Sequence, residues 1–282
     1  MNHAEWKERE RKTWSSVAEG WRRRDELLRK GAAPVTERML ELAAIAPGHR
    51  VLDIASGTGE PAISAARRVG ETGRVIGTDL VEAMLVFARE KAAQAGLDNI
   101  EFHCADGEAL EVAPASFDAA TIRWGLMFMP DPEACLKGVH RALKPGGRLV
   151  VACWAAPERN PFVDVALQTL ARYREVPRPP EGAPGIFAFA DPQRLHAVLA
   201  AAGFADVSIE QMEIDVIEAE DGAAYWAVLE DLAGPVKMLV DELDQDTRAA
   251  FVRDLIETVD ALQSEEVLRM RGTTWVAACL RP

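Results

Sequence analysis

Short apolar segments alternate with helical segments through the first half of the chain. Five of these segments have the length and composition of buried strands: 50–55, 74–79, 99–106, 117–124 and 148–154. Segments with helical periodicity lie between these strands. One begins at about residue 60, a second ends at about residue 95, and a third covers 131–143. Parallel strands need crossover connections, and helical crossovers cover both faces of the sheet. The first half of the chain therefore predicts an α/β fold with a parallel sheet.

The pattern is less regular after Trp154. Residues 157–192 are rich in proline, and the segment PRPPEGAPG predicts a loop over 177–185. The remaining predicted elements are a helix at 192–202, a strand at 207–217, helices over 219–264 broken at Gly234-Pro235, and a strand at 273–282 beside the preceding strand. With these two strands the predicted sheet has seven strands, mostly parallel, of which the last is antiparallel.

The N-terminal segment has apolar side chains at helical spacings among many charges. This pattern predicts one or two amphipathic helices over 5–30, interrupted at Gly31 and Pro34, and a further helix over 35–45. One face carries a stripe of three tryptophans: Trp6, Trp14 and Trp21. The stripe is typical of a helix packed on a core, and it also fits a lid that excludes water from a site.

These patterns divide the chain into two parts. We expect an N-terminal helical cap over 1–46 and an α/β domain over 47–282. The domain is expected to contain inserted segments at 155–190 and 219–264, which would join the N-terminal helices in the cap.

The amino-acid composition and net charge exclude several classes of protein and disfavour several kinds of partner. The 282 residues are 49% hydrophobic and 27% charged, which is ordinary globular usage and excludes disordered and collagen-like classes. A net charge of -13 disfavours nucleic acid or an anionic membrane as a partner, because the surface repels phosphates. The four cysteines form no zinc motif and no disulfide framework, so no metal site is expected. No apolar run could span a membrane, and we expect a cytoplasmic protein.

Candidate chemistry begins where the first strand ends. Asp53 lies at the end of this strand, and a turn of small residues, ASGTG, follows over 55–59. Small residues before a helix let backbone N–H groups approach a ligand. A lone G-x-G is weak evidence, and a bare turn without a ligand is an equal alternative. Asp53 can orient this turn or attract a cationic amine.

Two further carboxylates close the next strands. Asp79 follows Gly57 by 22 residues, a spacing that suits hydrogen bonds to the two hydroxyls of a ribose. Asp106 ends the third strand, where it could accept a hydrogen bond from an adenine amino group. Any one of these residues alone is typical of an ordinary loop or helix cap. Together around one glycine turn they indicate a nucleoside ligand without phosphates, because the acids would repel a pyrophosphate.

Several segments resemble the class I S-adenosylmethionine-dependent methyltransferases. DIASGTG is similar to the first motif of the family, GTDLVEAML to its second-strand acidic motif, and RALKPGGRLVV to its later turn and strand. TIRWGLMFMPD over 121–131 is similar to the fourth-strand segment of the ubiquinone/menaquinone-biosynthesis C-methyltransferase group. The resemblance covers about 48–155 well and about 190–217 loosely. It implies a Rossmann-like sheet with helices on both faces.

The resemblance also implies the cofactor, S-adenosyl-L-methionine, and its product, S-adenosyl-L-homocysteine. It implies that the turn over 55–59 holds the methionine part, that Asp79 binds the ribose, and that Leu80 packs on the adenine. Asp106 and Gly107 would read the polar edge of the adenine, and Arg123 would contact the amino-acid end. The full set of expected cofactor-binding residues, which includes Trp21 from the N-terminal helices outside the resemblance, is Asp53, Ala55, Ser56, Gly57, Thr58, Gly59, Asp79, Leu80, Met84, Asp106, Gly107, Arg123 and Trp21.

The chain departs from the family pattern at a few positions. Ala55 stands where the usual first motif has its first glycine. Arg123-Trp124 and Met127-Phe128 replace smaller or differently charged residues of the quinone enzymes.

The expected activity is methyl transfer to a small, moderately apolar molecule. Orientation of the reactants can supply roughly 7–11 kcal/mol of the barrier, so no catalytic residue is obligatory and none is assigned. The substrate pocket is expected to include Trp14, Trp124, Phe128 and Tyr173. The acceptor atom, the use of a general base and the formation of a homo-oligomer stay open.

Two alternatives remain at this level. The chain could bind S-adenosylmethionine without methylating, as an accessory protein. It could also be an NAD-dependent oxidoreductase that uses the same glycine turn, although Asp53 and the lack of a recognisable hydride-transfer group disfavour this reading.

Overall fold

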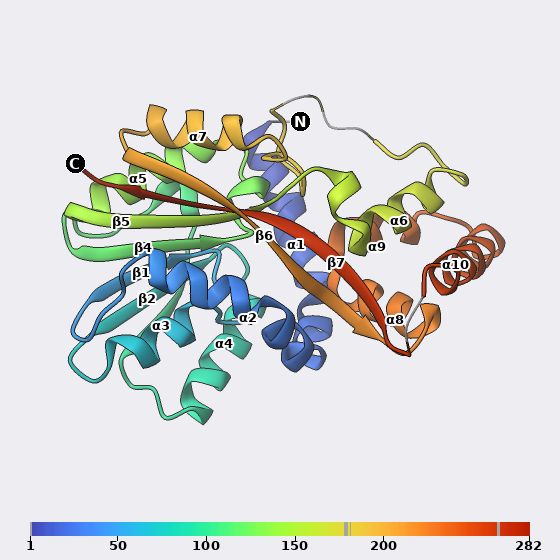
Figure 1. Cartoon of the computed structure of the whole chain (residues 1–282), viewed down its shortest axis with the longest axis horizontal. Coiled ribbons are helices and arrows are strands. Elements are labelled where there is room, and N and C mark those ends of the chain that lie inside the picture. Colours follow the sequence, from blue (N-terminus) through green and yellow to red (C-terminus); the bar gives the residue numbers. More distant parts are fainter. Residues whose placement is uncertain (1, 178–179, 181, 264–265) are drawn as a thin grey trace.

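The computed structural model describes residues 2–177, 180, 182–263 and 266–282, and these contain one sheet with helices on both faces (Figure 1). Its seven strands have the order β3-β2-β1-β4-β5-β7-β6. In chain order they are β1 (Arg50–Ile54), β2 (Arg74–Asp79), β3 (Ile100–Cys104), β4 (Phe117–Arg123), β5 (Leu143–Trp154), β6 (Ala205–Ala219) and β7 (Leu268–Leu280). The pairs among β1 to β5 are parallel, whereas β7 is antiparallel to both β5 and β6. The predicted fold class is confirmed.

The helices fall into groups that Figure 1 separates. Those near β1 to β5 are α2 (Asp25–Leu42), α3 (Ala62–Val69), α4 (Glu82–Gln94), α5 (Pro132–Ala142) and α7 (Pro192–Ala201). A second group gathers around the far ends of the long strands β6 and β7: α6 (Pro161–Leu170), α8 (Gly222–Leu232), α9 (Gly234–Asp241) and α10 (Gln245–Asp260). The first helix, α1 (His3–Arg23), lies between the two groups. The described residues also contain three short 3-10 turns: η1 (Gly107–Ala109), η2 (Leu126–Phe128) and η3 (Pro157–Arg159).

The predicted interruption at Gly31 and Pro34 was wrong, because α2 continues through both residues. Pro34 removes one backbone hydrogen bond, and the burial of Val35 and Met39 at 0% exposure outweighs that loss. Gly31 allows close packing, since a Cβ atom there would lie 2.8 Å from the carbonyl oxygen of Asp215 in β6. Part of the segment expected to be a cap therefore covers the sheet instead.

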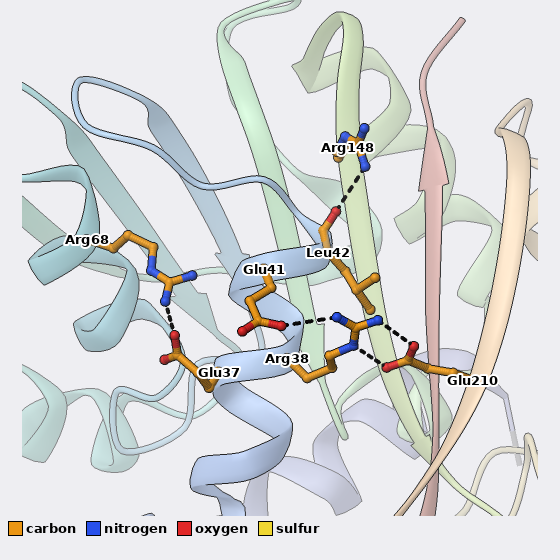
Figure 2. Close-up of polar contacts among 7 residues, drawn as sticks. All are labelled: Glu37, Arg38, Glu41, Leu42, Arg68, Arg148 and Glu210. Carbon is orange, nitrogen blue, oxygen red and sulfur yellow. Dashed lines mark hydrogen bonds and ion pairs between the residues drawn. The ribbon is translucent and has the colours of Figure 1, made fainter.

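Polar contacts fasten this helix to its neighbours (Figure 2). Arg38 donates to Glu210 of β6 through Nε at 2.6 Å and through Nη2 at 2.8 Å. Arg148 of β5 donates to the carbonyl oxygen of Leu42 at 3.3 Å, and Arg68 of α3 pairs with Glu37. Because a guanidinium that binds a carboxylate through two hydrogen bonds has a fixed direction, the Arg38–Glu210 pair also fixes the orientation of α2 relative to β6.

A helix within the proline-rich segment was missed. Pro161 occupies the start of α6, where a missing N–H costs no hydrogen bond. The helix buries Phe162, Val163, Ala166 and Leu170. The expected loop over 177–185 lies partly outside the described residues, at 178, 179 and 181.

The sheet contains a buried carboxylate at its centre. Asp53 of β1 has no solvent exposure, and its Oδ1 accepts a hydrogen bond of 2.6 Å from the hydroxyl of Thr121 in β4. Its Oδ2 has no hydrogen-bond partner among the described residues. Burial raises the pKa of Asp53 to about 7 from an ordinary value of 3.8. The protonated form is therefore favoured by folding.

This shift predicts a pH-dependent stability. Because the folded-state pKa lies above the unfolded value, the contribution of Asp53 to stability is complete below about pH 4 and is lost as the pH rises through about 7. Between pH 5 and pH 8, the unfolding free energy of the wild type should fall by about 2–3 kcal/mol more than that of Asp53→Asn. Urea unfolding of both proteins checks this difference, because other groups titrate in both. Parallel pH profiles would contradict it.

Candidate functional site

The strand order reverses between β1 and β4, so the loops after these two strands diverge. A cavity of about 160 Å³ lies between the loops. In open α/β sheets this switch point is the usual ligand site. The floor of the cavity comes from the carboxyl ends of β1, β2 and β4 and from η1, and its roof comes from α1.

The glycine turn after β1 forms part of this floor. Ala55 has φ 58°, Gly57 has φ 53° and Gly59 has φ 111°, all in the left-handed region. This conformation explains why glycine suits the turn, and Ala55 adopts it with some strain. The amide of Ser56 donates to the carbonyl oxygen of Thr78 at 2.9 Å, which ties the turn to the end of β2.

Asp79 fixes the same turn from the side of β2. Its Oδ2 accepts a hydrogen bond from the amide of Gly57 at 2.9 Å, and its Oδ1 accepts one from the amide of Val81 at 2.8 Å. Burial raises the pKa of this carboxyl group. Each oxygen keeps a further lone pair, so Asp79, which lines the cavity, can still accept hydrogen bonds from a ligand.

Asp106 has a partner that the sequence did not suggest. Its Oδ1 accepts from the amide of Glu108 at 2.9 Å, which caps η1. Its Oδ2 lies 2.7 Å from Nζ of Lys7, which also lies 2.5 Å from Glu108. Lys7 belongs to α1, so this ion pair joins the roof to the floor.

The other end of the floor carries opposite charges. Arg123 donates to the hydroxyl of Thr36 at 2.5 Å, and its guanidinium carbon lies 5.0 Å from the centre of the Trp124 ring. Burial lowers the pKa of Arg123, which stays protonated at neutral pH. No carboxylate forms an ion pair with it among the described residues. Glu60 lines the same cavity and accepts a hydrogen bond from the amide of Ser64 at 3.1 Å.

The roof is made by one face of α1. Trp6 donates through Nε1 to the carbonyl oxygen of Phe128 at 3.0 Å, and Trp21 donates to that of Leu232 at 3.0 Å. Trp14 donates to Oε2 of Glu10, also at 3.0 Å. The tryptophan stripe thus packs against the rest of the protein and also lies over the cavity, and its role as a lid that excludes water stays a prediction.

Most residues expected at the site come together around this cavity. Its lining includes Ala55, Ser56, Gly57, Thr58, Asp79, Leu80, Met84, Asp106, Gly107, Arg123, Trp14, Trp21, Trp124 and Phe128. Among the described residues, three expected members do not line it: Asp53, Gly59 and Tyr173. Asp53 lies below the floor, and Gly59 turns toward Ile63, whose Cδ1 would lie 2.6 Å from an added Cβ. Tyr173 donates its hydroxyl to Asp254 of α10 at 2.5 Å, which holds it between α6 and α10.

Six polar or aromatic lining residues were not among those expected from the sequence: Trp6, Lys7, Glu10, Glu60, Thr78 and Glu108. Glu60 directly follows the glycine turn, so its position was a usable signal. Lys7 gave no comparable signal, since its partners Asp106 and Glu108 are distant in the sequence.

Two properties of the described part of the chain bear on function. It contains no group of three or more histidine, cysteine, aspartate or glutamate side chains placed to hold a metal ion. None of the helices described there has both the length and the apolar character to cross a bilayer.

The fold is shared with several solved structures. A methyltransferase-like protein from Bacillus halodurans C-125 superposes with a TM-score of 0.56 at 19% identity, covering 88% of this chain and 98% of that one. The [4+2]-cyclase SpnF superposes with a TM-score of 0.54 at 22% identity, covering 88% and 81%. At these identities the likeness shows the fold alone.

Sequence comparison gives the closer relationship. The ubiquinone/menaquinone biosynthesis C-methyltransferase UbiE of Teredinibacter turnerae is 35% identical over 162 residues, which are 57% of this chain and 65% of that protein. That of Klebsiella pneumoniae is 40% identical over 124 residues, or 44% and 49% of the two chains. The match thus spans about half to two thirds of these relatives. The enzyme of Cronobacter sakazakii is 32% identical over 196 residues, or 66% and 78%.

The family model described as the ubiE/COQ5 methyltransferase family matches residues 9–175, which include most of α1, the glycine turn and every strand from β1 to β5. This chain belongs to the ubiE/COQ5 methyltransferase family.

Proposed function

We propose that the protein transfers a methyl group from S-adenosylmethionine to a small, moderately apolar molecule. The observation that carries this proposal is the charge pattern of the cavity floor. Arg123 and Glu60 stand at one end, Asp79 stands beside the glycine turn, and Asp106 stands at η1. An amino-acid zwitterion joined to a nucleoside presents complementary groups in the same order.

The floor residues fit this cofactor by their free hydrogen-bonding capacity. Arg123 has no carboxylate partner among the described residues, so it can bind the carboxylate of the methionine part. Asp79 has acceptor capacity for the ribose hydroxyls, and Leu80 offers an apolar surface to the adenine. Asp106 is already paired with Lys7, and its contact with the adenine edge would be shared with that ammonium group.

When bound, S-adenosylmethionine supplies an electrophilic methyl group on a positively charged sulfur, which becomes a neutral thioether as the new bond forms. The residues of this chain have to align the acceptor with that group and exclude water. Trp14, Trp124 and Phe128 form the apolar part of the wall, and α1 covers the cavity from above. Positioning of this kind can supply most of the rate enhancement.

The proposal is tested by incubating the purified protein with methyl-radiolabelled S-adenosylmethionine and a small-molecule extract. Label should enter a compound of the extract, at a rate proportional to protein concentration. Tight cofactor binding without any transfer across acceptor classes would favour the non-methylating alternative. Absorbance changes of added NADH would instead favour the oxidoreductase reading.

Asp79 should contribute strongly to cofactor binding. Asp79→Ala should weaken S-adenosylhomocysteine binding by about 1.5–3 kcal/mol, the usual size of hydrogen bonds to a charged group. Asp106→Ala should cost less, because water can replace an edge contact. Calorimetry measures both affinities, and Asp98→Ala, at an exposed loop position, is the matched control. Unchanged affinity in the Asp79 variant would refute the ribose assignment.

Arg123 should distinguish ligands by their amino-acid end. Arg123→Met should weaken S-adenosylhomocysteine by about 1.5–3 kcal/mol, because a buried carboxylate loses its guanidinium partner. Methylthioadenosine has the same nucleoside but no amino-acid end, so its affinity should change little. Both affinities are measured by calorimetry. An equal loss for the two ligands would show that Arg123 acts on the fold and does not bind the carboxylate.

A further inference from the structure

One carboxylate of the cavity is left without a strong partner. The cavity is lined by five described carboxylates: Glu10, Glu60, Asp79, Asp106 and Glu108. Asp106 and Glu108 share the ammonium group of Lys7, and Asp79 accepts two backbone amides. Glu60 accepts the amide of Ser64 and lies at the same end of the cavity as Arg123. Glu10 in the roof is the remaining carboxylate.

The surroundings of Glu10 compensate its charge only in part. The residue is 7% exposed, and its Oε2 accepts one hydrogen bond, from the indole of Trp14 at 3.0 Å. The nearest cation is Arg9, whose Nη2 forms an ion pair with Oε1 at 3.6 Å, longer than a hydrogen bond. The guanidinium of Arg9 also stacks on the Trp6 ring at 3.9 Å. Burial raises the pKa of Glu10, as expected for an anion whose counter-charge is incomplete.

Aromatic rings form the walls beside this carboxylate. The Trp14 ring lies 5.9 Å from the Trp21 ring at an angle of 83° and 5.1 Å from the Phe128 ring at 74°, and all three rings line the cavity. The indole N–H groups of Trp14 and Trp21 are already hydrogen-bonded to protein oxygens. The rings therefore have fixed orientations, and what they offer a ligand is aromatic surface.

We propose that Glu10, Trp14, Trp21 and Phe128 form a subsite for an onium group, a positively charged sulfur or nitrogen that carries carbon substituents. Aromatic faces attract such cations, and a nearby carboxylate adds charge attraction where water is excluded. A neutral group of the same shape gains neither the attraction to the aromatic faces nor the attraction to the carboxylate. The subsite thus separates charged from neutral ligands.

An onium group can come to this subsite from two sources, and the inference rests on the proposed function only for the first of them. One source is the sulfonium of S-adenosylmethionine, which S-adenosylhomocysteine lacks. The subsite would then favour the methyl donor over the spent product. The other source is an ammonium group on the acceptor molecule. The same chemistry serves both, and binding measurements distinguish them.

The first arm compares two cofactors on three proteins. Calorimetry gives the affinities of S-adenosylmethionine and S-adenosylhomocysteine for the wild type, Glu10→Gln and the control Glu19→Gln, an exposed position of the same helix. The ratio of the two affinities cancels every contact that the ligands share. For a sulfonium subsite, Glu10→Gln should weaken S-adenosylmethionine about tenfold and leave S-adenosylhomocysteine within about twofold. Glu19→Gln should change neither affinity.

The second arm titrates tetramethylammonium into the protein saturated with S-adenosylhomocysteine. For an ammonium subsite, the wild type and Glu19→Gln should bind this ion, and Glu10→Gln should bind it about tenfold more weakly. An unchanged cofactor ratio together with tetramethylammonium binding that does not depend on Glu10 would overturn the proposal.

Two further outcomes stay informative. If thermal melting shows that Glu10→Gln does not fold, the wild type alone decides: equal affinities for the two cofactors and no tetramethylammonium binding would overturn the subsite. If neither cofactor binds the wild type, the proposed function fails, and tetramethylammonium binding to the free wild type but not to Glu10→Gln would still support the subsite.

Discussion

The reversal of strand order between β1 and β4 is the constraint on which the site depends. The helix after β1 and the helix after β4 cover opposite faces of the sheet, so the loops that lead to them separate and leave a crevice. Asp79 then sets the shape of this crevice by binding the amides of Gly57 and Val81. Every cofactor contact proposed above starts from these two facts.

The strands and the glycine turn could be predicted because their signals are local. Apolar segments between turn residues identify β1 to β5. Asp79 is the last residue of β2, and Asp106 follows the end of β3 by two residues as the cap of η1. The helices α2 and α6 were misjudged because a proline in the sequence was given more weight than burial. Val35 and Met39 show that packing can retain a helix through an internal proline.

The roof could not be predicted in the same way. Lys7 acquires its role from Asp106, and Glu10 from a cavity whose floor is formed by residues more than 40 positions away in the sequence. In the sequence these two residues are ordinary members of a charged helix. Tyr173, which was expected in the substrate pocket, does not line the cavity and bonds to Asp254, a residue 81 positions away whose pairing with it nothing in the sequence indicated.

The ion pair between Lys7 and the acids of η1 has a kinetic consequence. In the proposed binding mode this ion pair lies at the adenine end of the cavity, and we expect ligand exchange there to require that this contact and the Trp6 hydrogen bond open together. The Lys7 and Asp106 side chains remain 22% and 32% exposed, within reach of dissolved ions. Salt screens such pairs over a distance of about 8 Å at physiological ionic strength. We therefore expect ionic strength to change how readily α1 separates from η1, and with it the residence time of a ligand in the cavity.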